Sequence, residues 1–101
     1  MQQFNSLIDA ILEDNGLSLE QVATICAVET DWLIKHVEEG LLEPLPKQDE
    51  WRFSSTTLIR VRRLVSLERD FDAVPELAAL VADMQEEIDL LRRKLQRVEI
   101  E

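Results

Sequence analysis

Residue types that build disulfides, metal sites and phosphate loops are scarce in this sequence. Its 101 residues contain one cysteine, one histidine and two glycines. A single cysteine excludes an internal disulfide, and with a single histidine it cannot supply a zinc site of the usual cysteine and histidine type. The two glycines lie too far apart for a glycine-rich phosphate loop. We therefore expect no metal, no cofactor and no enzyme activity.

Long apolar runs and secretory features are also missing. No segment approaches the roughly 18 consecutive apolar residues of a transmembrane helix. The N-terminal residues lack both the basic region and the cleavage site of a signal peptide. A lone cysteine also agrees with a reducing compartment. The sequence therefore predicts a cytoplasmic protein without a membrane partner or a small-molecule substrate.

Positive charge is scarce in the first half of the chain. Residues 1–50 carry eleven acidic and two basic side chains, a net charge of −9, whereas residues 51–101 carry ten and nine, a net charge of −1. These sum to the formal net charge of −10. An acidic front half favours a basic partner, or equally serves solubility.

Residues 17–44 have the pattern of two short helices joined by a tight turn. Ser18 and Gln21 have the spacing of a capping box, and apolar residues follow at helical intervals. The turn is expected at residues 27–29, with the second helix starting at Glu29 or Thr30. Gly40 suits the left-handed conformation after that helix, and Pro44 prevents its continuation. The segment predicts a helix-turn-helix.

The second of these helices has the wrong charge for reading DNA. A helix-turn-helix protein places that helix in the major groove, where cations must neutralise phosphates. Here a single cation, Lys35, is outnumbered by acids on the helix and its approaches: Glu29, Asp31, Glu38, Glu39 and Glu43. The scaffold is that of a DNA-binding protein, and the charge argues against DNA.

Shorter segments flank this unit. Residues 1–16 predict a short amphipathic helix that either packs on the core or acts as an arm. Around Arg52, the aromatic residues Trp51 and Phe53 alternate as in a short hairpin strand with both rings in the core, in the position of a wing. A further helix is expected from Thr56 to about Arg69, and it carries a basic cluster of Arg60, Arg62, Arg63 and Arg69.

The tail has the strongest periodicity in the chain. Apolar residues recur alternately every three and four positions over residues 74–98, which is a heptad seam. We expect this helix to form a homodimer, parallel or antiparallel, through Leu77, Val81, Met84, Ile88, Leu91 and Leu95. The alternative is that it folds back on its own domain. The expected organisation is mainly α, with an N-terminal helix (1–16), a winged helix-turn-helix domain (17–70) and a dimerisation helix (71–101).

Three segments together resemble a known family. They are DWLIKHVEEGLLEP (residues 31–44), WRFS (51–54) and the charged heptad pattern of the tail. The chain resembles the MerR-type winged helix-turn-helix over about residues 17–98, and more narrowly the chaperone-modulator family CbpM. The resemblance implies a small dimeric cytoplasmic regulator. Such a protein binds the J-domain of a DnaJ-like co-chaperone that also binds curved DNA, and inhibits both its co-chaperone activity and its DNA binding.

The resemblance also directs the assignment of residues. In DNA-binding MerR regulators the position of residues 34–36 usually reads Arg-Tyr-Tyr, whereas here it reads Ile-Lys-His. We assign the acidic face of the helix-turn-helix to J-domain binding, with residues Glu29, Asp31, Trp32, Lys35, Glu38 and Glu39. Trp32 is either the apolar anchor of that face or a core tryptophan. We expect His36 at the domain surface or edge and Cys26 in the core.

Two other functions remain open at this point. A MerR-family transcriptional regulator would contact DNA through Arg52, Arg60, Arg62 and Arg63. A structural coiled-coil protein would dimerise without a regulated partner. Salt-sensitive binding to a J-domain, a mobility shift on DNA, or neither would distinguish the three.

Overall fold

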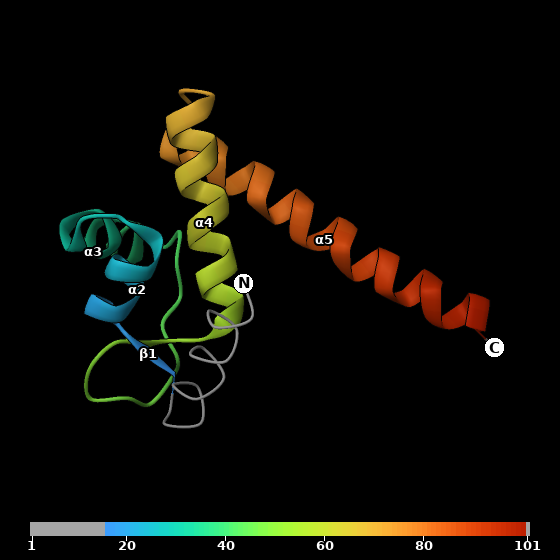
Figure 1. Cartoon of the computed structure of the whole chain (residues 1–101), viewed down its shortest axis with the longest axis horizontal. Helices are drawn as coiled ribbons and strands as arrows, with labels where there is room; N and C mark the ends of the chain where they lie inside the picture. The colour runs from blue at the N-terminus through green and yellow to red at the C-terminus, as the bar shows by residue number, and fades with distance from the viewer. Residues whose placement is uncertain (1–15, 101) are drawn as a thin grey trace.

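The fold is a small helical domain from which one long helix projects. The computed structural model describes residues 16–100, with side chains to residue 98, so the helix expected within residues 1–16 lies outside the described part. The elements are β1 (Leu17–Ser18), α2 (Leu19–Cys26), α3 (Thr30–Glu38), β2 (Arg52–Phe53), α4 (Ser55–Asp70) and α5 (Pro75–Ile100). Figure 1 shows α2 and α3 beside α4, and α5 extending away from them. The mainly α prediction is confirmed.

The helix-turn-helix forms where the sequence predicts it. The Ser18 hydroxyl accepts the Gln21 N–H at 3.1 Å, and the Gln21 side chain accepts the Ser18 N–H at 2.8 Å, which completes the capping box. Ala27 ends α2 in the left-handed conformation, and α3 begins at Thr30. Gly40 follows α3 with φ +77°. The chain reversal after each helix therefore matches the local sequence signals.

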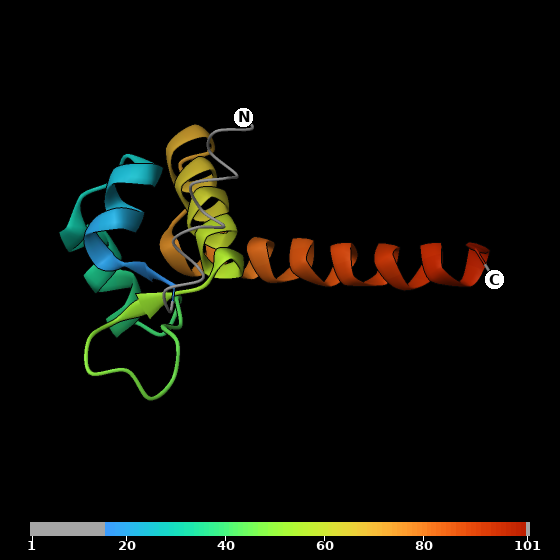
Figure 2. The same cartoon turned by 60° about the horizontal axis from the view of Figure 1, so that its bottom comes forward.

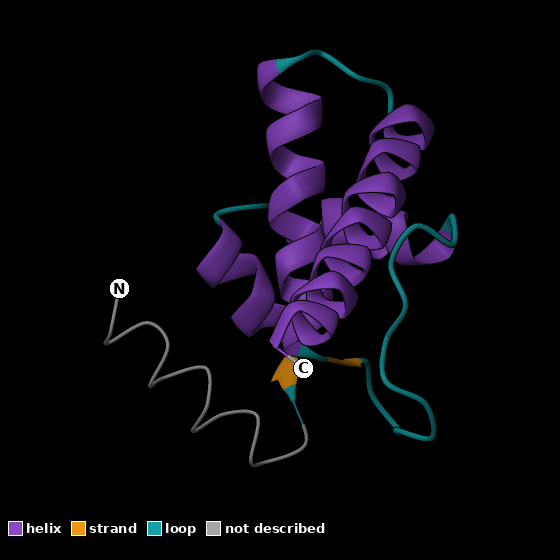
Figure 3. Cartoon of the chain, turned by 90° about the vertical axis from the view of Figure 1, so that its right-hand side faces the viewer, coloured by secondary structure: helices purple, strands orange, loops and turns teal. Residues whose placement is uncertain are grey.

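The strand prediction was correct for β2, and the partner of β2 is a strand that the sequence did not indicate. β2 pairs antiparallel with β1, which directly precedes α2, and Leu17 lies opposite Phe53. Figure 3 shows the two strands below the helices. Phe53 is fully buried, but Trp51 is 38% exposed, so the expectation that both rings are in the core was wrong for Trp51. Trp51 precedes the strand, where the chain has not yet joined the sheet.

The core lies between the helix-turn-helix, β2 and the α4–α5 pair. Its largest fully buried side chains are Leu17, Val22, Leu33, Leu42, Phe53, Val61 and Leu64. Ser54 caps α4 by accepting the Thr57 N–H at 3.2 Å, and Pro75 occupies the first turn of α5, a position that suits proline. Because α5 packs on this core through small alanines, its backbone approaches closely there; the buried positions are Ala78, Ala79 and Ala82.

The rest of α5 leaves the domain with its apolar residues uncovered. Leu77, Met84, Ile88, Leu91 and Leu95 are each between 45% and 58% exposed, while Val81 is partly buried. Figure 2 shows the helix extending well beyond the other elements. The alternative that the helix folds back on its own domain thus holds for part of α5, and the dimer stays a prediction. One face of α5 packs on its own domain, and the heptad stripe (Leu77, Val81, Met84, Ile88, Leu91 and Leu95) lies largely outside that contact.

Candidate partner-binding site

The outward face of α3 presents the predicted charged residues to solvent. Asp31, Lys35, Glu38 and Glu39 follow one another at helical spacing, so their side chains share one face, and all four are exposed. Asp31 lies in the first turn, where the helix dipole favours a carboxylate. Glu29 is exposed at the N-cap position, without a capping hydrogen bond from its side chain. The structure thus brings Asp31, Lys35, Glu38 and Glu39 together on what we term the acidic face, whereas Glu29 lies at the start of the helix and lines the hollow beside Trp32.

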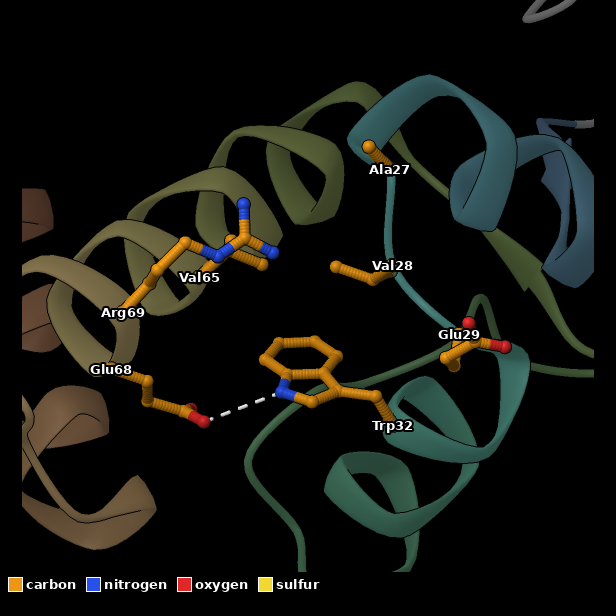
Figure 4. Close-up of a pocket in the computed structure, with 7 residues that line it drawn as sticks. All are labelled: Ala27, Val28, Glu29, Trp32, Val65, Glu68 and Arg69. Carbon is orange, nitrogen blue, oxygen red and sulfur yellow. Dashed lines mark hydrogen bonds between the residues drawn. The ribbon is translucent and has the colours of Figure 1, made fainter.

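Trp32 lies at the edge of the acidic face and lines a hollow beside it. The hollow measures about 440 Å³ and is bounded by the α2–α3 turn, α3 and α4. Figure 4 shows the Trp32 indole together with Val28 and Val65 around this space, and Arg69 above it. Trp32 is partly buried against the core. Part of Trp32 packs inward and part of it lines an open surface, so its role as an anchor stays a prediction.

The expectation that His36 lies at the surface was wrong, since it is 98% buried with 2% exposure. Its ring stacks on Trp32 with centroids 3.6 Å apart. Nδ1 lies 2.7 Å from the Trp32 carbonyl oxygen, and Nε2 lies 2.8 Å from Glu68 Oε2. The Trp32 indole N–H donates to Glu68 Oε1 at 3.3 Å. Glu68 on α4 therefore connects to both side chains and fixes α3 against α4.

Sequence reasoning did not single out Glu68. The i, i+4 spacing of Trp32 and His36 predicts that their rings meet on one face of a helix. Glu68 lies 32 residues beyond His36, on another helix, and no local pattern relates the two. Only the packing of α3 on α4 brings this carboxylate to the rings.

The arginines of the DNA-binding alternative mostly contact their own chain. Arg52 donates to the Gly16 carbonyl at 2.8 Å. Arg60 donates to the Leu41 carbonyl at 2.8 Å and forms ion pairs with Asp83 at 2.7 Å and Glu86 at 2.6 Å. Arg63 pairs with Asp89 at 2.6 Å. Arg62 is exposed and interacts with the Cys26 thiol. The cluster is therefore partly neutralised by carboxylates of α5.

Ionisation follows from these contacts. Burial lowers the pKa of Arg60, but hydrogen bonds to Glu86 and Asp83 outweigh it, so the pKa is raised. The hydrogen bond from Arg63 lowers the pKa of Asp89. Burial raises the pKa of the Cys26 thiol, opposed by Arg62. The ion pairs of Arg60 and Arg63 with carboxylates of α5 thus connect α4 to α5.

Within residues 16–98 no three His, Cys, Asp or Glu side chains are grouped so as to hold a metal ion. No helix in the described part of the chain is long and apolar enough to cross a membrane.

Comparison with known proteins adds two findings. The family of MerR helix-turn-helix regulatory proteins matches residues 17–99. A relative from Pseudomonas entomophila (strain L48), described as chaperone modulatory protein CbpM, is 33% identical over 73 residues, which cover 68% of this chain and 72% of the relative. No solved structure matches.

Proposed function

Because this chain belongs to the MerR helix-turn-helix family of regulatory proteins and is CbpM-like within it, we propose that it is a chaperone modulator. Its proposed partner is the J-domain of a DnaJ-like co-chaperone that also binds curved DNA. Binding would inhibit both the co-chaperone activity and the DNA binding of that partner. The description of the relative as a chaperone modulatory protein and the resemblance of motifs support this proposal.

The single observation that carries the proposal is the charge of the acidic face. The helix that would enter a DNA groove exposes Asp31, Glu38 and Glu39 against one Lys35. Phosphates would be repelled there, since DNA affinity depends on cations that displace counterions. A J-domain engages its Hsp70 partly through a basic helical face, and this surface is complementary to it. Such complementarity speeds encounter and selects the partner.

Trp32 is suited to be the apolar anchor of this contact. Interface energy concentrates in a few aromatic or arginine anchors surrounded by polar contacts. Trp32 borders the acidic face, and its indole is held by the hydrogen bond to Glu68 and by stacking on His36. An anchor already held in one rotamer loses little conformational freedom on binding. A partner side chain that enters the hollow would contact this preformed wall.

Inhibition follows from competition for one surface. A partner helix whose basic face is covered by this protein cannot use the same face for Hsp70. The bound modulator also adds negative charge beside the co-chaperone, and its net charge of −10 repels DNA. Both inhibitory effects thus come from the same acidic molecule.

We also propose that the protein is a homodimer through the heptad stripe of α5. The stripe residues lie on one side of a helix that projects from the domain, and a lone helix with such a stripe exposes a large apolar surface. Replacing Ile88 by Glu should dissociate the dimer, as seen by light scattering after size-exclusion chromatography. Replacing Ile59 on α4, which is 53% exposed, by Glu is the matched control. A monomeric wild type would contradict this part of the proposal.

The J-domain contact is tested by reversing charge at the end of α3. We choose Glu38→Lys with Glu39→Lys, because cations near a helix C-terminus do not destabilise it. The control, Glu43→Lys with Glu87→Lys, changes two other exposed acids by the same total charge, and neither lies in the first turn of a helix. Calorimetric titration with the isolated J-domain should show at least tenfold weaker binding for the first variant and a smaller change for the control.

Binding measurements at varied salt and with duplex DNA can contradict the proposed J-domain contact. Wild-type affinity should fall as salt increases, since exposed charges are screened. Equal affinities of the two double variants would remove the acidic face from the contact. Tight binding of duplex DNA at physiological salt, without capture of the J-domain, would support the transcriptional regulator instead.

A further inference from the structure

A second hollow lies on the other side of α3, where α3 approaches the start of α2 and the loop that leads into β2. It measures about 430 Å³. Its apolar walls are Leu19 of α2, Ile34 of α3 and Trp51 of the loop. Trp51 is 38% exposed, which contradicts the core position that the sequence suggested. The exposed part of the indole provides a surface for another molecule.

Carboxylates surround this apolar surface. Glu20, Asp49 and Glu50 line the hollow and are all exposed. We term the hollow, with these carboxylates and the three apolar side chains, the tryptophan groove. Among the ion pairs of the described residues, none involves these three carboxylates. The groove therefore combines an aromatic face with negative charge.

That combination selects a cation with an apolar stem. A guanidinium or ammonium group is attracted to the face of an indole, and tryptophan is the most favourable of the aromatic residues for this contact. Long basic side chains lay their methylene groups on apolar surface while the charged end reaches polar groups. Arginine suits the site better than lysine, because its planar guanidinium is weakly hydrated and stacks on aromatic rings.

We propose that the tryptophan groove binds an arginine side chain from the basic helix of the J-domain. The arginine stem would lie on Leu19 and Ile34, and its guanidinium would stack on Trp51 beside Asp49 and Glu50. This inference rests on the proposed function, and it adds a second contact to the same partner. The sequence prediction for the partner surface did not include any of these residues.

The groove is continuous with the acidic face. Ile34 lies one helical turn from both Asp31 and Glu38, so the wall of the groove borders the exposed carboxylates of α3. Figure 2 shows the loop into β2 below α2 and α3, with the free end of α5 on the opposite side of the picture. One basic helix laid along α3 could therefore reach both the acidic face and Trp51 without contacting α5.

Other occupants fit the charge less well. A phosphate of a nucleic acid would meet three carboxylates at the rim, and like charges repel. A purely apolar side chain would bury the apolar walls but would desolvate the carboxylates without pairing them, which is unfavourable. An arginine covers the apolar walls with its stem and pairs its charge with the carboxylates at the rim.

The test compares three variants with the wild type. Trp51→Ala removes the aromatic wall, and Asp49→Asn with Glu50→Gln removes two charges while keeping side-chain size. Phe71→Ala is the matched control, because Phe71 is an exposed ring (74%) at the turn between α4 and α5. Circular dichroism melts verify that each variant is folded. The isolated J-domain and an arginine-rich amphipathic helical peptide are titrated by calorimetry into each variant.

The outcomes separate this inference from the proposed function. We expect both groove variants to bind the J-domain and the peptide at least tenfold more weakly, and Phe71→Ala to match the wild type. If the J-domain binds and the folded groove variants match the wild type, the groove is refuted and the proposed function stands. If only the peptide binds, and does so through Trp51, the groove binds arginine and the J-domain assignment fails. If the wild type binds neither, both are refuted.

Discussion

Replacing Glu68 by alanine and by glutamine separates the contribution of its hydrogen bonds from that of its negative charge. Nδ1 of His36 faces the Trp32 carbonyl, which can only accept, so Nδ1 carries a proton. A second proton must lie between Nε2 and Glu68 Oε2, which are 2.8 Å apart. The pair is nearly dry on the histidine side, with side-chain exposures of 3% and 18%. Alanine removes the acceptor and leaves Nε2 buried without a partner.

The loss of stability expected for Glu68→Ala follows from the burial of the His36–Glu68 pair. A hydrogen bond to a charged group contributes about 1.5–3 kcal/mol. Breaking a fully buried ion pair costs about 3–5 kcal/mol. Because Glu68 is partly exposed and the Trp32 indole lines an open hollow that water can enter, the lower range applies. We expect Glu68→Ala to lower the free energy of unfolding by about 2–3 kcal/mol.

Glutamine should behave differently. Its amide N–H can donate to Nε2 of a neutral His36 while its oxygen still accepts the Trp32 indole N–H, so every polar group keeps a partner. The loss for Glu68→Gln should stay below about 1 kcal/mol.

Urea unfolding followed by circular dichroism, at one protomer concentration and neutral pH, measures both changes. Equal losses for the two variants, or a loss below about 0.5 kcal/mol for alanine, the range of ordinary surface substitutions, would refute this account of the cluster.

Three further predictions concern the packing and Cys26. Ala82 is fully buried between α5 and α4, so Ala82→Leu should lower the free energy of unfolding by about 1–3 kcal/mol through overpacking; an unchanged urea midpoint would contradict this. Gly16→Ala should destabilise more than Gly40→Ala in the same assay, because a Cβ at Gly16 would lie 2.8 Å from the Phe53 carbonyl oxygen, whereas Gly40 faces open space; the reverse order would disprove it. Burial raises the pKa of Cys26, so less thiolate forms at pH 8 and iodoacetamide should react more slowly with the folded than with the urea-unfolded chain; equal rates would argue against a shielded thiol.

Much of the fold could be predicted because its signals are local. The capping box at Ser18 and Gln21, the left-handed Gly40 and the start of α5 at Pro75 each depend on residues within one helical turn. The acidic face could be predicted for the same reason, since spacing along one helix decides which side chains share a face.

Other features could not be predicted, because they depend on distant parts of the chain. The partner of β2 was missed, since β1 is only two residues long and lacks a strand pattern of its own. The burial of His36 and the exposure of Trp51 were also missed, as both follow from how α3 and the loop before β2 meet other elements.

The sequence alone determined where the helices begin and end, that the second helix of the helix-turn-helix is acidic, and that the last helix carries an apolar stripe. Backbone capping and side-chain periodicity depend only on neighbouring residues, so the local order of the sequence determines them. The tertiary structure alone decided that Glu68 meets His36 and Trp32, that Arg60 and Arg63 pair with α5, and that Trp51 forms an open groove. Long polar and aromatic side chains take the partners that packing brings within reach, and this packing is a property of the whole domain.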